Sequence, residues 1–210
     1  MRRLGIIVLG AMLLSTFAVP EALAAGWEST RSYNAFWHSQ RNVDRDTYVR
    51  ITWYAGVYEQ TEGFWSDLYK STQRCERRPG RDRCRRGTYM VGVIEDLGDG
   101  EFTLSEDLST GYFEATYPME IYEGGDERNA GRIRITVNLT GVGDLSSSRE
   151  SYSYEEGCFR YSYTSRSSYR QAVANGTLTF LRTDTTQDLA DTEDANFGTS
   201  RYRTRETNLC

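Results

Sequence analysis

The sequence predicts an all-β protein, an antiparallel β-sandwich built from two similar repeat units of about 84 residues. Composition is the first observation: 15 Tyr and 19 Gly stand beside only 3 Pro, which favours strands joined by turns. The second is a strict alternation of apolar and polar side chains in two stretches. The third is that these two stretches resemble each other.

Residues 49–57 and 133–142 predict two strands that each bury one face. Alternate side chains point to opposite faces of a strand, so period 2 in hydrophobicity indicates a half-buried strand. The predicted inward side chains are Val49, Ile51, Trp53, Ala55 and Val57 in the first stretch, and Ile133, Ile135, Val137 and Leu139 in the second.

The resemblance extends beyond these strands. Residues 50–52 match residues 134–136 at a shift of 84, and Cys75 falls near Cys158 at a shift of 83. We therefore expect residues 47–97 to superpose on residues 131–181 with the same strand order. The alternative is that any two β-rich stretches share such short fragments.

The remaining chain is divided around the two units. Residues 1–24 are predicted to be a signal peptide and 25–46 an N-terminal segment, followed by unit 1 at 47–127 and unit 2 with a C-terminal tail at 128–210. Whether the units form one domain or two is left open. Further strands are predicted at 87–95, 101–105, 110–118, 158–164, 169–181 and 197–205, and an acidic loop at 184–196.

The N-terminus has the three parts of a secretory signal. Arg2 and Arg3 precede an uncharged apolar run, 4–19, and Ala22-Leu23-Ala24 is a small-x-small cleavage site. We expect a secreted, extracellular protein cut after Ala24 or Ala25, with no membrane span. An uncleaved N-terminal anchor is the alternative.

The four cysteines follow this predicted cut, and exported proteins fold under oxidising conditions. Folding residues 75–84 about Pro79-Gly80 places Cys75 opposite Cys84, and closing this loop would contribute about 2.7 kcal/mol. In the second unit Ser168 takes the place equivalent to Cys84, so Cys158 has no partner there. Cys210 is the one cysteine that remains, and we predict that Cys158 pairs with Cys210. The alternative is a bond from Cys210 to another chain.

No metal or other cofactor is predicted. The Cys-x8-Cys spacing is not that of a zinc site, and the one histidine, His38, is distant in sequence and is expected to be a packed side chain. Acidic residues at 95–101 offer oxygen ligands for Ca²⁺, but their spacing is not that of an EF-hand.

Arginines are concentrated in the loop between the first two cysteines. Residues 74–86 hold seven arginines against two acidic residues, whereas 87–127 hold eleven acidic residues and no Lys or Arg. We predict that Arg77, Arg78 and Arg81 form a hairpin tip that binds an anionic envelope polymer or a partner protein. The alternative is that these arginines pair with the acidic strands. The net charge of −5 argues against nucleic acid.

Tyrosines form the second candidate surface. Tyr48, Tyr54 and Tyr58 share one predicted strand face, and aromatic side chains also cluster at 152–154 and 159–163. Flat amphipathic rings can stack on sugars while their hydroxyls donate hydrogen bonds. The alternative is that they pack between the two sheets.

No motif for a serine hydrolase, zinc protease, P-loop or dinucleotide site occurs. The prediction is therefore a secreted non-catalytic binding or assembly protein that acts on envelope polysaccharide or on a partner protein. One alternative is a polysaccharide hydrolase with paired carboxylates such as Glu59 and Glu62, or Glu106 and Asp107. The other is a structural matrix or appendage subunit. Oligomeric state is left open.

Overall fold

The computed structural model describes residues 27–123 and 125–210, without the side chains of 190–193. The predicted signal peptide lies outside this part of the chain. The described residues form nine strands and no helix. The strands are β1 (Glu28–Asn42), β2 (Thr47–Gln60), β3 (Gly63–Glu76), β4 (Arg83–Ile94), β5 (Glu101–Leu104), β6 (Thr110–Glu123), β7 (Asp126–Glu156), β8 (Phe159–Phe180) and β9 (Thr185–Asn208).

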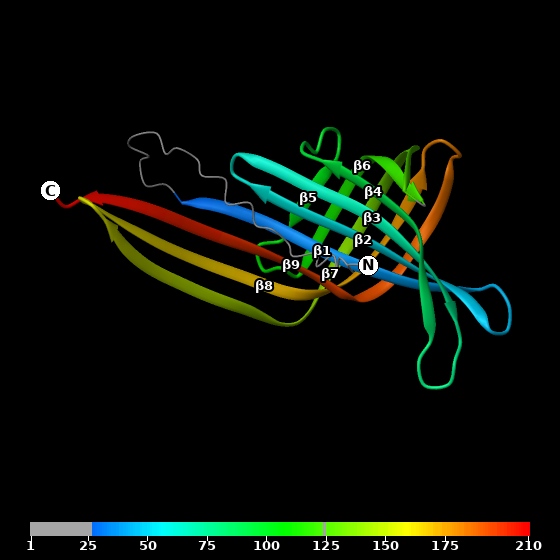
Figure 1. Cartoon of the computed structure of the whole chain (residues 1–210). Coiled ribbons are helices and arrows are strands. Elements are labelled where there is room, and N and C mark those ends of the chain that lie inside the picture. The colour runs from blue at the N-terminus through cyan, green and yellow to red at the C-terminus, as the bar shows by residue number, and fades with distance from the viewer. Residues whose placement is uncertain (1–26, 124) are drawn as a thin grey trace.

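All nine strands belong to one antiparallel sheet, which confirms the predicted all-β class. The strand order is β4-β3-β2-β1-β9-β8-β7-β6-β5, and a further pairing of β4 with β6 joins the two sides (Figure 1). That pairing is short, from Tyr89↔Tyr122 to Val91↔Glu120. It closes eight strands into a ring, and β5 pairs with residues 111–114 on the same edge of β6 that β4 contacts at residues 120–122.

The predicted sandwich is not confirmed, because the described strands form one closed sheet and not two stacked sheets. The alternation that predicts an inward face is obeyed: Trp53, Ala55 and Val57 of β2 are buried, as is Ile135 of β7. Their partners come from the other strands of the ring. The largest fully buried side chains are Trp53, Tyr33, Tyr117, Phe113, Phe197, Leu68, Leu108, Met119, Ile133, Ile135, Leu139 and Leu178.

The two-unit repeat is not confirmed either. Residues 47–94 cross the sheet three times, as β2, β3 and β4, whereas 133–180 cross it only twice, within β7 and β8. The difference begins after the matched stretches. The first chain segment turns at Thr61-Glu62, but the second continues through an irregularity between Val142 and Ser146 and stays in the same strand.

Residues 184–196 are not the predicted loop. They lie mostly in β9, which pairs with β8 from Thr185 onward and with β1 through Ala195. The pattern is hard to recognise because few apolar side chains point inward, among them Leu189 and Ala195. Two register shifts in the pairing with β8, near Ala174, also interrupt the alternation.

Three strands extend beyond the closed ring as an arm (Figure 1). β7 pairs with β6 only as far as Thr140, but continues along β8 to Glu156. β9 follows β8 to Asn208 on the other side. We call residues 145–170 and 197–208 the arm. Its tip is tied by the disulfide between Cys158 and Cys210.

Among the described residues, no helix is long and apolar enough to cross a membrane.

Candidate binding surface

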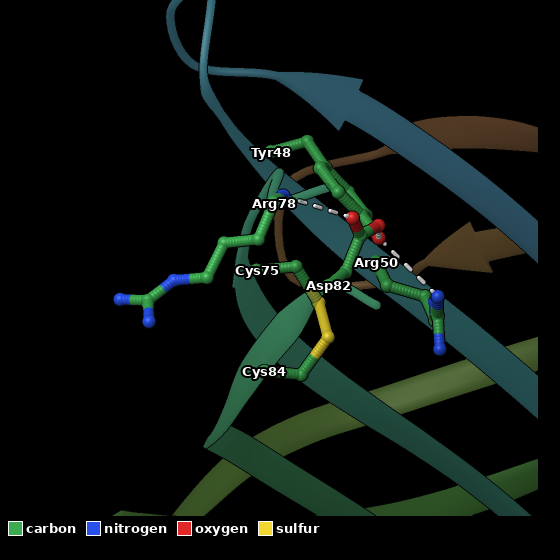
Figure 2. Close-up of a disulfide and its surroundings, with 6 residues drawn as sticks. All are labelled: Tyr48, Arg50, Cys75, Arg78, Asp82 and Cys84. Carbon is green, nitrogen blue, oxygen red and sulfur yellow. Dashed lines mark hydrogen bonds between the residues drawn. A yellow bond between two sulfur atoms is a disulfide. The ribbon is translucent and has the colours of Figure 1, made fainter. Parts of the chain in front are cut away.

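The hairpin between β3 and β4 carries the predicted disulfide. Cys75 pairs in register with Cys84, and the two are bonded (Figure 2). The neighbouring pair in the register is Glu76↔Arg83. Both predicted bonds are therefore confirmed, and every cysteine is used. The loop that closes the hairpin turns at Gly80, whose φ of 86° lies in the region that favours glycine.

Tyr48, Asp82 and Arg77 hold this hairpin against the β1–β2 loop. The Tyr48 hydroxyl donates to Asp82 Oδ2 at 2.5 Å, and this bond holds the Asp82 pKa below its usual value. The Arg77 guanidinium lies 5.2 Å from the centre of the Tyr48 ring and donates to the Arg45 carbonyl at 2.8 Å. Because Tyr48 is only 2% exposed, its ring supports the hairpin from beneath.

Arg78 and Arg81 point to different surroundings. The Arg78 side chain extends away from the disulfide (Figure 2) and contacts Glu76 at 2.9 Å, and Arg81 is exposed at the tip. In the described part of the chain, no ion pair joins a hairpin arginine to the acidic residues of 87–127. The positive charge of the hairpin is thus presented to solvent.

A polar groove of about 640 Å³ lies on the outer face of β1, β2 and β3, next to this hairpin. The register places His38, Thr52 and Ser71 side by side across the three strands. The next row toward the hairpin supplies a guanidinium and two amides. The groove is lined by His38, Ser39, Gln40, Arg50, Thr52, Ser71 and Gln73.

A row of aromatic rings borders the same groove on its other side. Phe36 and Tyr54 have ring centres 4.7 Å apart, and Tyr54 and Tyr69 are stacked at 4.5 Å. Tyr69 leads to Tyr89 at 5.9 Å, and Tyr89 to Tyr122 at 6.3 Å. This aromatic row crosses β1, β2, β3, β4 and β6, so it spans the pairing that closes the sheet.

A half-buried carboxyl lies beneath the row. Gly56 is the neighbour of Asp67 across β2 and β3, and a Cβ on Gly56 would stand 2.3 Å from the Tyr54 hydroxyl oxygen and 2.7 Å from Asp67 Oδ1. The absence of a side chain at Gly56 therefore lets the Tyr54 ring cover Asp67. Asp67 Oδ1 is buried with no hydrogen-bond partner, and desolvation raises the Asp67 pKa to about 6.

Tyr58 belongs to a second groove, where the arm leaves the ring. This groove, about 480 Å³, is lined by small residues, including Ser32 and Gly198, and by Tyr58, Tyr163 and Tyr202. Tyr58 is 43% exposed. On the arm the same face carries two stacked cross-strand pairs, Tyr152–Tyr163 and Tyr154–Tyr161.

The six residues predicted to bind a ligand are therefore not one cluster. Tyr48 and the three arginines lie at the hairpin, Tyr54 lies in the aromatic row, and Tyr58 lies at the second groove. The sequence indicated the hairpin, but not the groove beside it, whose residues come from three strands. The alternation in β2 predicted that Thr52 lies on the outer face of the sheet. β1 and β3 were not predicted as strands, so the groove residues on them could not be placed from the sequence.

One residue of each carboxylate pair in the hydrolase alternative, Glu59 and Asp107, is engaged in local structure. Arg31 Nε donates to Glu59 Oε2 at 2.5 Å. Asp107 accepts from the Ser109 backbone amide at 3.0 Å, and hydrogen bonds from Ser109 lower the Asp107 pKa to about 2. Among the described residues, no group of three or more His, Cys, Asp or Glu side chains could hold a metal ion.

Comparison with known proteins does not assign this chain to a class. No family model matches it, and no curated protein matches it at a significant level.

Proposed function

We propose that this chain is a secreted, non-catalytic binding protein whose outer surface at the hairpin end of the closed sheet binds an acidic polysaccharide. One observation carries the proposal: the polar groove at His38, Thr52 and Ser71 lies between a row of aromatic rings and a cluster of arginines. The two disulfides are compatible with an extracellular protein. An extracellular location is also what the predicted signal peptide implies.

The chemistry of the groove suits a charged sugar chain. Aromatic faces such as that of Tyr69 can stack on the apolar face of a sugar ring. Amides and hydroxyls at the base, such as Gln73 and Thr52, can bond to sugar hydroxyls. A guanidinium such as that of Arg50 can hold a carboxylate or sulfate with two parallel hydrogen bonds. On the face of the sheet that carries the groove, Arg86 pairs in register with Gln73, and Arg77, Arg78 and Arg81 lie in the adjacent hairpin.

The first experiment removes charge at the hairpin tip. The double variant Arg78→Ser/Arg81→Ser avoids Arg77, whose side chain braces the β1–β2 loop. We expect retention on immobilised polygalacturonate to fall about tenfold, or about 1.4 kcal/mol. The difference should narrow at high salt, where screening already weakens the wild type.

The matched control is Arg132→Ser/Arg134→Ser, which removes two exposed arginines from β7 and changes the net charge equally. It should retain near wild-type binding at every salt concentration. Equal losses for the two double variants would mean that only net charge matters, and unchanged binding of the hairpin variant would contradict the proposal.

The second experiment tests the aromatic row. Tyr69→Ala removes a half-buried ring that stacks on Tyr54, and we expect at least a fivefold weaker interaction with polygalacturonate, because stacking depends on the ring. Tyr154→Ala on the arm removes a comparably paired ring far from the groove and should bind normally. If only the Tyr154 variant loses binding, the arm and not the groove binds the polymer.

The chain length of the polymer separates binding from hydrolysis. A binding protein leaves polygalacturonate unchanged after prolonged incubation. A hydrolase using paired carboxylates would shorten it and release new reducing ends. Detection of such ends with the purified protein would overturn the non-catalytic assignment.

A further inference from the structure

The arm leaves one edge of β7 without a partner. From Ser146 to Glu156 each residue of β7 pairs with β8, between Ser146↔Tyr169 and Glu156↔Phe159. On its other side, β7 pairs with β6 only up to Thr140, and no described strand covers 145–156. A row of backbone donors and acceptors is therefore open for pairing.

This edge has four charged side chains but lacks three other features that usually prevent pairing with another chain, namely proline, lysine and a bulge. Residues 146–156 contain no Pro and no Lys, and their register with β8 has no bulge after Ser146. Every residue of β7 from 147 to 156 is exposed, so both faces of this edge strand are open to solvent, with Tyr152 at 58% and Tyr154 at 53% on one of them. A long regular edge of this kind is a template for strand addition.

Arginines on the face of the arm opposite the tyrosines indicate that an added strand should carry negative charge. Arg149 pairs with Arg166, and Arg166 pairs with Arg201, so three like charges lie side by side across the arm. Like charges directly opposite each other destabilise a sheet. No ion pair to Arg149 or Arg201 is present in the described part of the chain. A carboxylate next to Arg149 would offset this repulsion.

Glu155 of a second copy can supply that carboxylate. Arg149 and Glu155 lie on the same face of the same edge strand, since they differ by an even number of residues. The two bonds from Arg160 to Glu155 both end on Oε1, so Oε2 takes no part in them.

We propose that two copies of this chain pair antiparallel along the β7 edge, with Tyr152 opposite Tyr152 at the two-fold axis. In this register Arg149 faces Glu155 twice, and Ser148 faces Glu156 twice. Moving the axis to Glu150 or Ser153 places Glu150 opposite a glutamate, and moving it to Ser151 places no opposite charges together. The chosen register alone among these gives two ion pairs and no like-charge pair.

Pairing about Tyr152 keeps the tyrosine faces of both arms on one side, because an axis normal to the sheet does not exchange its faces. The dimer would present a six-stranded sheet with the tyrosine grooves at its two ends. This inference does not depend on the polysaccharide proposal, since the hairpin groove and the arm edge share no residue.

Charge reversal tests the register. Arg149→Glu alone places glutamates opposite each other, and Glu155→Arg alone places arginines opposite each other, so each variant should be monomeric at concentrations where the wild type dimerises. An equimolar mixture restores both ion pairs and should dimerise again. Sedimentation velocity over a concentration series measures the oligomeric state of the wild type, of each variant and of the mixture.

A wild type that stays monomeric up to millimolar concentration would overturn the proposal, as would a mixture that does not recover. Tyr152→Cys gives an independent reading, because its thiol lies opposite its own copy. Under mild oxidation this variant should form a covalent dimer quickly. Ser151→Cys, which faces Ser153, is the matched control and should crosslink much more slowly; equal rates would exclude the proposed register.

Discussion

The Asp67 carboxyl is half-buried because residues of β2 pack against it. Tyr54 covers it from above, Gly56 leaves it no competing side chain, and its buried oxygen has no hydrogen-bond partner. Its pKa of about 6 lies above that of a carboxyl in an unfolded chain, about 3.9. The folded state therefore binds the Asp67 proton more tightly than the unfolded state does.

The sign of the resulting pH dependence follows from linkage. Above pH 6 the ionised Asp67 lowers the free energy of unfolding, and this loss disappears as the pH falls from about 6 to about 4. We expect Asp67→Asn to raise the free energy of unfolding at pH 7.5 by about 1–2 kcal/mol, after allowance for partial exposure, and to have little effect at pH 4. Denaturant titrations at the two pH values measure this.

Asp144→Asn, which alters an exposed carboxyl, is the control and should change stability little at either pH. A destabilising Asp67→Asn at pH 7.5 would show that the Asp67 charge is compensated by contacts that the structure does not place there.

Some of these individual residues could be predicted from the sequence, and others could not. The disulfide partners followed from a turn at Pro79-Gly80 and from Ser168, and both bonds are present. Asp67 carried no signal, because its burial depends on Gly56 of another strand and on the ring of Tyr54. Such a site exists only once the register of β2 and β3 is known.

At the scale of elements, the two disulfides close loops of different length. The bond in the hairpin spans 9 residues and the bond at the arm tip spans 52. On the chain-entropy account these loops contribute about 2.7 and about 4 kcal/mol. Cys158→Ser/Cys210→Ser should therefore lower the free energy of unfolding more than Cys75→Ser/Cys84→Ser. Urea titration of the two double variants is the test. A smaller loss for the arm variant would mean that the arm opens separately from the ring.

Close backbone approach within β7 and β8 predicts a second element-scale effect. A Cβ on Gly176 would stand 2.2 Å from the Thr136 carbonyl oxygen, which is backbone and cannot move alone. We expect Gly176→Ala to lower the free energy of unfolding by about 2 kcal/mol or more. Gly63→Ala, where a Cβ meets nothing within 4 Å, should have almost no effect. Comparable melting temperatures for the two variants would contradict this packing.

The strands that sequence analysis missed share a physical reason. β1 and β3 carry aromatic side chains on their outer faces, such as Phe36 and Trp65, and five of the eleven residues 184–194 at the start of β9 are acidic, so none gives a simple apolar alternation. Their strand structure depends on pairing with neighbours that lie far away in sequence, as in β1 and β9.

At the scale of the whole molecule, alternation predicted a buried face but not what lies against it. A sandwich and a closed sheet both require one apolar face on each strand. The choice depends on the three residue pairs that join β4 to β6, and these pairs bring Tyr89 beside Tyr122 on the outer surface. No local pattern in either strand marks that contact.

The most direct test of the proposed binding surface is an NMR titration of the ¹⁵N-labelled protein with a short polygalacturonate oligomer. The account predicts amide shift changes concentrated at residues 38–40, 50–54 and 69–73, with smaller changes at the hairpin tip. The same titration at high salt should show weaker binding at the same residues. Changes confined to the tyrosine groove around Ser200, or no changes at all, would contradict it.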